Sequence, residues 1–79
     1  MISELIHDWK KYCIDENFIG IGSTRKVFRY YEYVIKVNIH NMGYSQSLKE
    51  QQIYEYMKSE GYGHIFAPVY LVNEEVCIQ

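Results

Sequence analysis

The stretch FIGIGSTRKVFRYYEYVIKVN, residues 18–38, alternates apolar with polar residues, and this two-residue period constrains the fold more than any other feature. Successive side chains of a β-strand point to opposite faces, so the period predicts strands over 18–22, 26–31 and 33–38. Turn-forming residues over 23–25 separate the first two strands. Strands joined by such short turns pair antiparallel, which predicts a three-stranded meander.

A segment with helical spacing precedes this stretch. Ser3 is a suitable N-cap for a helix over about residues 3–15, in which apolar side chains recur every three or four positions. We expect this apolar stripe to pack on the sheet, with Trp9 as a core anchor rather than a functional residue.

A second helical segment follows the meander. Its expected start lies after a loop over 40–45, where Ser45 or Ser47 can cap it, and it ends at Gly61. Ser47 and Glu50 fall on the same side of this helix as its apolar residues. The sequence therefore places a carboxylate on the helix face that we expect to meet the sheet.

The remaining elements complete a small α+β domain. Residues 69–72 and 76–78 are typical of two further short strands. The expected fold is a five-stranded antiparallel sheet with one main helix between the third and fourth strands, plus the N-terminal helix. Because 79 residues make one domain at most, we expect a single unit over 1–79, with the helix in 1–16 and the sheet domain in 17–79.

The charge and the apolar runs of the chain disfavour several classes of protein. A formal net charge of −2 argues against a general nucleic-acid binder. No apolar run reaches the length that spans a membrane. Glu4 and Asp8 interrupt any signal-peptide core. We therefore expect a cytoplasmic protein with no membrane partner.

Neither the cysteines nor the histidines form a pattern typical of a metal site. Cys13 and Cys77 are isolated in apolar surroundings, which is typical of buried thiols in a reducing compartment. His7, His40 and His64 lie far apart in the sequence and lack ligand spacing with the cysteines. We expect no bound metal.

A glycine-containing turn, a strand lysine and a helix glutamate are the candidate functional groups. Gly20 and Gly22 stand one residue apart, and Lys36 lies within an apolar strand. Glycines let backbone amides approach phosphate oxygens, and a lysine supplies a compact cation for the same group. Glu50 is an acidic residue on the helix face that we expect to meet the sheet.

In these motifs and in the order of its elements, the chain resembles the N-terminal lobe of the protein-kinase-like fold over about residues 17–79. IGIGSTRKV, residues 19–27, matches the family pattern G-x-G-x-x-G-x-V except that Arg25 replaces the third glycine, and YVIK, residues 33–36, falls on V-A-I-K. We expect the implied Lys36–Glu50 pair to be exposed to solvent and worth about 0–1 kcal/mol. The resemblance implies a vestigial or weak nucleotide site formed by Gly20, Gly22, Ser23, Val27, Val34, Lys36 and Glu50.

The motifs that perform phosphoryl transfer in that family are not in this sequence. It contains neither H-R-D-x-x-x-x-N nor D-F-G, which hold the catalytic base and the magnesium ions. We therefore expect no enzyme activity and no cofactor. Two alternatives stay open: the ATP-binding half of a split or truncated kinase, with weak ATP binding, and a generic α+β domain whose resemblance is accidental.

The nine tyrosines of the chain either fill a thin core or form an interaction surface. The resemblance favours a surface, because this lobe packs on a second lobe in a complete kinase. We expect a non-catalytic protein-binding module, a small regulator or inhibitor of bacterial or phage type, that binds another protein or itself. A sheet edge is a second candidate surface, through strand addition. The candidate partner-binding residues are Tyr44, Tyr54, Tyr62 and Phe66.

Overall fold

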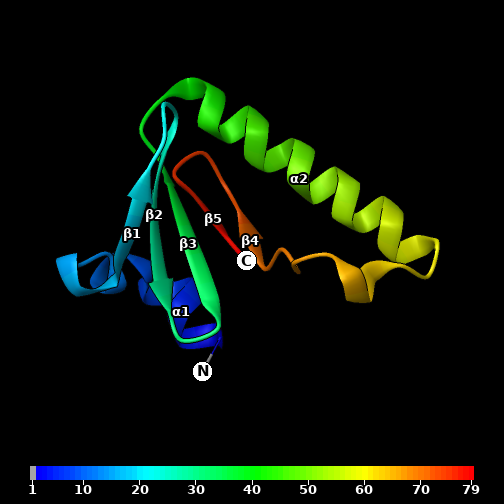
Figure 1. Ribbon diagram of the computed structural model, residues 1–79, viewed down its shortest axis with the longest axis horizontal. Coiled ribbons are helices and arrows are strands. Elements are labelled where there is room, and N and C mark those ends of the chain that lie inside the picture. Colours follow the sequence, from blue (N-terminus) through cyan, green and yellow to red (C-terminus); the bar gives the residue numbers. More distant parts are fainter. Residues whose placement is uncertain (1) are drawn as a thin grey trace.

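The computed structural model describes residues 2–79 and contains one five-stranded antiparallel sheet (Figure 1). The strands lie in the order β1-β2-β3-β5-β4. This arrangement confirms the predicted α+β fold, with one main helix, α2, between the third and fourth strands and an N-terminal helix, α1. In chain order the elements are α1 (Ile2–Asp8), the 3-10 turns η1 (Trp9–Tyr12) and η2 (Asp15–Asn17), β1 (Phe18–Ile21), β2 (Arg25–Tyr30), β3 (Tyr33–Asn38), α2 (Asn41–Ser59), the 3-10 turn η3 (Gly63–Ile65), β4 (Leu71–Val72) and β5 (Val76–Ile78).

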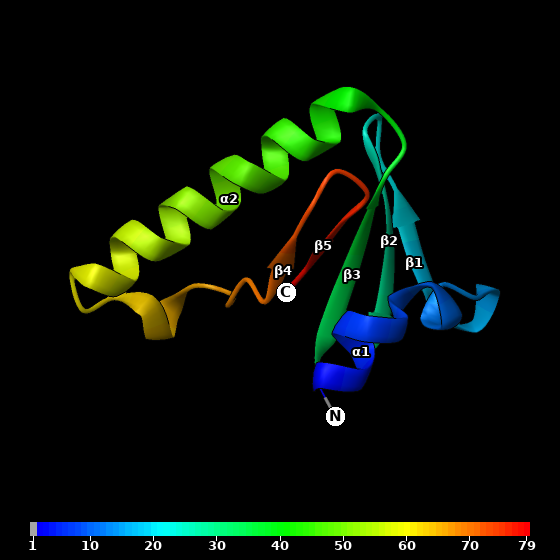
Figure 2. The same cartoon turned by 180° about the vertical axis from the view of Figure 1, so that it is seen from behind.

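The hydrophobic core lies on the face of the sheet that α1 covers. Its buried members come from α1, β2, β3 and β5, and they pack against one another: Leu5, Phe28, Ile35, Val76 and Ile78. Figure 2 shows α1 in front of the sheet on this side. The apolar stripe of the N-terminal segment thus packs on the sheet, as predicted.

The N-terminal helix is shorter than its apolar pattern predicts. The α-helical part ends at Asp8, and the chain continues through two 3-10 turns to Asn17 instead of one helix over 3–15. The Asn17 side-chain amide donates a hydrogen bond of 2.8 Å to the Tyr12 carbonyl. The contact thereby satisfies the carbonyl at the end of η1.

The start of α2 also differs from the prediction, since the helix begins at Asn41, inside the expected loop. His40 is the N-cap: its backbone is extended and its Nδ1 accepts a hydrogen bond of 3.1 Å from the Met42 N–H. Ser47 is fully buried and donates instead to the Gly43 carbonyl, at 3.0 Å. A histidine therefore performs the capping that the sequence assigned to a serine.

The strands agree closely with the predicted ranges, except at one edge. The predicted strands over 33–38 and 76–78 are present with the same bounds. The strand expected over 69–72 is reduced to Leu71–Val72. The short edge strand follows Pro68, which lacks a backbone N–H for a strand ladder.

Candidate functional site

A row of residues across the sheet forms the base of the candidate site. Gly20 pairs with Val27, Val27 with Lys36, and Lys36 with Cys77. Residues that pair directly across antiparallel strands point to the same face. Ile35 lies in the core, so its neighbour Lys36 points to the opposite face, and the whole row faces away from α1.

The carboxylate of Glu50, on α2, meets two cations above this row. Its Oε2 lies 3.1 Å from Lys36 Nζ, and its Oε1 lies 2.6 Å from Arg25 Nη1. The side chains of Arg25, Lys36 and Glu50 are 17%, 20% and 33% exposed, so the expected solvent-exposed pair is instead a half-buried, three-residue cluster. We call Arg25, Lys36 and Glu50 the Glu50 cluster.

The first turns of α2 hold Glu50 in this position by packing closely on the β1–β2 hairpin tip. The Thr24 hydroxyl lies 2.5 Å from Gln46 Oε1, and the Thr24 carbonyl accepts from the Ile39 N–H at 2.9 Å. Gly43 is buried at this contact. A Cβ added to it would lie only 2.8 Å from the Thr24 carbonyl oxygen. The hairpin tip and the start of α2 lie side by side in both ribbon views (Figures 1 and 2).

The charges of the cluster shift the pKa values of two groups. Partial burial by itself raises the pKa of Glu50, but the hydrogen bonds and charges of Arg25 and Lys36 outweigh it and lower the pKa overall. Burial raises the pKa of the Cys77 thiol, and the Glu50 charge raises it further. The carboxylate is therefore ionised at neutral pH while the adjacent thiol stays protonated.

Glu50→Gln should lower the free energy of unfolding by about 1 kcal/mol at pH 7, because two half-buried cations lose their counter-charge. Because the pKa of Glu50 is lower in the folded protein, its ionised carboxylate stabilises the fold at pH values above the ordinary carboxyl pKa of about 4.3. This stabilisation is lost as the pH falls through the pKa of the folded state. The difference between wild type and variant, measured by urea unfolding, should therefore shrink below about pH 4. The exposed Glu55→Gln is the control, and a difference that stays constant with pH would contradict this assignment.

Two adjoining hollows open beside the Glu50 cluster. One, of about 280 Å³, is lined by Val34, Lys36 and Tyr70 among others. The other, of about 180 Å³, is lined by Glu50, Tyr54 and Phe66 among others. Ala67 and Gln79 line both hollows, so the Lys36–Glu50 pair lies between them. The site therefore combines an ion pair with apolar walls.

The structure brings most of the predicted nucleotide-site residues together. Gly20, Val27 and Lys36 share one row, Val34 lies on the same face of β3, and Glu50 contacts Lys36. Gly22 and Ser23 lie apart from them, at the hairpin tip. The Gly22 N–H donates to the Arg25 carbonyl at 2.9 Å, so this amide is already bonded within the hairpin.

The predicted partner-binding residues fall into two groups. Tyr54 and Phe66 line one hollow, and Tyr62 is 53% exposed just beyond the end of α2. Tyr44 lies near the opposite end of α2, where it shares a separate hollow with Asn38, His40 and Glu74 among others. The structure thus groups three of the four candidates at one end of the helix.

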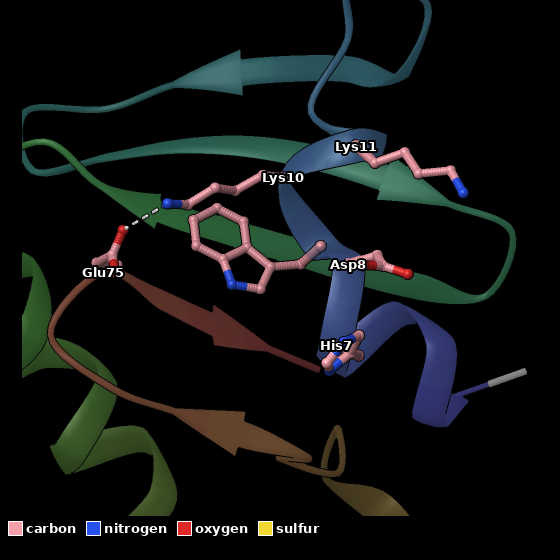
Figure 3. Close-up of a pocket in the computed structure, with 6 residues that line it drawn as sticks. His7, Asp8, Lys10, Lys11 and Glu75 are labelled. Carbon is pink, nitrogen blue, oxygen red and sulfur yellow. Dashed lines mark ion pairs between the residues drawn. The ribbon is translucent and has the colours of Figure 1, made fainter.

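A further hollow, of about 430 Å³, lies beside the N-terminal helix, and its lining includes Trp9, Lys10, Lys11 and Glu75 (Figure 3). Lys10 Nζ lies 3.4 Å from Glu75 and 5.5 Å from the centre of the Trp9 ring. The Lys10 and Glu75 side chains are more than half exposed, so their pair adds little stability. Trp9 is half-buried and packs against the core, which is the role predicted for it.

Sequence reasoning missed three members of the site, namely Ser47, Cys77, and Arg25 in its role as a partner of Glu50. Arg25 was considered only as a replacement for a glycine, although strand alternation puts it on the same face as Lys36. Ser47 lies one helical turn before Glu50, and its hydroxyl is 3.5 Å from Arg25 Nη1. Cys77 was recognised only as a buried thiol, because its register with Lys36 is not readable from either strand alone.

Comparison of the chain with protein-family models, with curated proteins and with solved structures gives no match. No helix in the described part of the chain, residues 2–79, is both long and apolar enough to cross a membrane. Within the same residues, no three His, Cys, Asp or Glu side chains are grouped so that they would hold a metal ion.

Proposed function

We propose that this chain is a non-catalytic module with the form of a protein-kinase N-terminal lobe, and that it regulates another protein by binding it. The contact of 3.1 Å between a β3 lysine and an α2 glutamate supports the likeness. The strand order and the position of α2 support it as well. Because the sequence contains neither catalytic motif, protein binding is the function that this form leaves to the chain.

An exposed apolar surface carries this proposal. The second half of α2 has no fully buried residue, whereas its first half contains Gly43 and Ser47. Figure 1 shows the end of α2 and the segment after it extending beyond the sheet. Exposed apolar side chains occur on several elements, and those at the end of α2 and in the segment after it are our candidate protein interface. We call this region the partner surface: Ile53, Tyr54, Tyr62, Ile65 and Phe66.

The chemistry of this surface favours a protein partner over a small ligand. Ile53, Tyr62 and Ile65 are each more than half exposed, and tyrosine and isoleucine here offer apolar area with few polar groups. The two hollows beside them are open and end on the charged Lys36–Glu50 pair. A partner with an apolar anchor flanked by a charged or hydrogen-bonding group would complement both features.

Ile65→Lys should abolish capture of the partner, because it replaces an exposed apolar side chain of the partner surface by a charged one. The measurement is affinity capture from an extract of the cells that make the protein, with wild type and variant compared band by band. Ile21→Lys is the matched control, since Ile21 and Ile65 are 62% and 63% exposed and Ile21 lies on β1. The proposal fails if wild type captures nothing specific, or if Ile65→Lys captures the same proteins.

The split-kinase alternative is favoured by one observation, the Lys36–Glu50 pair, and a titration separates it from the proposal. Magnesium and ATP are titrated against wild type and Lys36→Ala by calorimetry. For a non-catalytic binding module we expect no saturable heat of binding with either protein, because the sequence lacks the motifs that hold the magnesium ions. Saturable binding that is lost in Lys36→Ala would instead support the ATP-binding half of a kinase.

A further inference from the structure

We propose that two copies of this chain associate by antiparallel pairing of their β1 strands. β1 is one of the two edge strands of the sheet, with a neighbour on one side only. Its four residues, Phe18–Ile21, contain no charge and no proline, two of the features that protect exposed edges. This edge is separate from the partner surface, so the inference does not rest on the proposed function.

The backbone of β1 offers hydrogen-bonding groups along its outer side. The Gly22 N–H donates to the Arg25 carbonyl at 2.9 Å, so that pair is bonded within the hairpin. Bonded and non-bonded pairs alternate along an antiparallel ladder, so the backbone groups of Ile21 point away from β2. The register irregularity of this strand lies between Phe18 and Gly20, so it includes Ile19, and the pairing with β2 is regular from Gly20 to Ile21.

Gly20 leaves the middle of this edge without a side chain. It lies at the register irregularity of β1, and a Cβ at this position would meet nothing within 4 Å. A glycine inside a strand is typical of a bulge or of a site where another backbone comes close. Ile19 and Ile21, on either side, are 59% and 62% exposed, so apolar surface flanks the glycine.

A second copy fits this edge because the edge is complementary to itself. A twofold axis at Gly20 would place Ile19 of one copy opposite Ile21 of the partner subunit. The exposed Asp15 and Glu16 precede β1, whereas the exposed Lys26 lies at its other end, on β2. Antiparallel pairing would bring the acidic end of each copy to the basic end of the other, which favours a second copy over an unrelated strand.

The test is sedimentation equilibrium over a series of protein concentrations. The apparent mass of wild type should rise from 9.5 kDa toward twice that value. Ile21→Lys should weaken association by about tenfold or more, because it exchanges buried apolar area for a charge. Ile65→Lys, matched in exposure, should associate as wild type does. The amide hydrogen of Ile21 should also exchange more slowly at high protein concentration.

Three results would overturn this inference. Wild type that stays monomeric at every concentration excludes association altogether. Association that survives Ile21→Lys, with the Ile21 amide unprotected, places the contact elsewhere. Loss of association in Ile65→Lys but not in Ile21→Lys would assign self-association to the partner surface. The proposed function would stand in any of these cases if capture of another protein still depends on Ile65. Circular dichroism of both variants confirms that each is folded.

Discussion

Leu5→Ala should lower the free energy of unfolding by about 2–5 kcal/mol, the range typical of large-to-small core substitutions. Leu5 is 1% exposed and packs against Phe28, Ile35, Val76 and Ile78, so the alanine leaves a cavity between α1 and three strands. Small domains are only marginally stable, so a loss of this size leaves a large unfolded fraction.

Urea unfolding followed by fluorescence measures this loss, since the chain has a single tryptophan, which lies beside the core. Ile53→Ala is the control: Ile53 is 51% exposed on α2, and its removal should cost well under 1 kcal/mol. If Leu5→Ala were no more harmful than this control, the N-terminal helix would be an appendage rather than part of the core.

Gly43→Ala should destabilise the protein by about 1–2 kcal/mol, although glycine-to-alanine changes inside helices ordinarily stabilise by about 1 kcal/mol. A Cβ at residue 43 would lie 2.7 Å from Asn38 Oδ1 and 2.8 Å from the Thr24 carbonyl oxygen. Backbone cannot give way as a flexible side chain does, so α2 must move off the hairpin. That movement would carry Glu50 away from Arg25 and Lys36.

Two readouts test this expectation. The first is the free energy of unfolding, for which Gly20→Ala at low protein concentration is the control, because a Cβ there meets nothing. The second is the pH dependence of stability, which should weaken in Gly43→Ala if the Glu50 cluster is disturbed. A stabilised Gly43→Ala protein with unchanged pH dependence would mean that α2 and the hairpin tip are not tightly packed.

The local chemistry of the chain was sufficient to predict the secondary structure. The two-residue period over 18–38 gave the strands, and the recurrence of apolar side chains gave both helices. The errors lie at the helix ends. His40 caps α2 in place of a serine, and α1 ends at Asp8 where a longer helix was expected.

The candidate site was predicted only in part. Helix periodicity placed Glu50 toward the sheet, and the resemblance to the kinase N-terminal lobe implied its contact with Lys36. Arg25 shares the same carboxylate because β2 pairs with β3 in a register that sets it beside Lys36 and under α2. The burial of the resulting cluster also exceeds the solvent-exposed pair that was predicted.

The sequence by itself determined which segments are strands and helices and which face of each is apolar, because these depend on residues a few positions apart. Only the tertiary structure decided that three residues share one charge cluster, that the first turns of α2 pack on the hairpin tip, and that β1 is left as an edge strand. These features depend on strand register and helix docking, which are set by contacts between residues far apart in the chain.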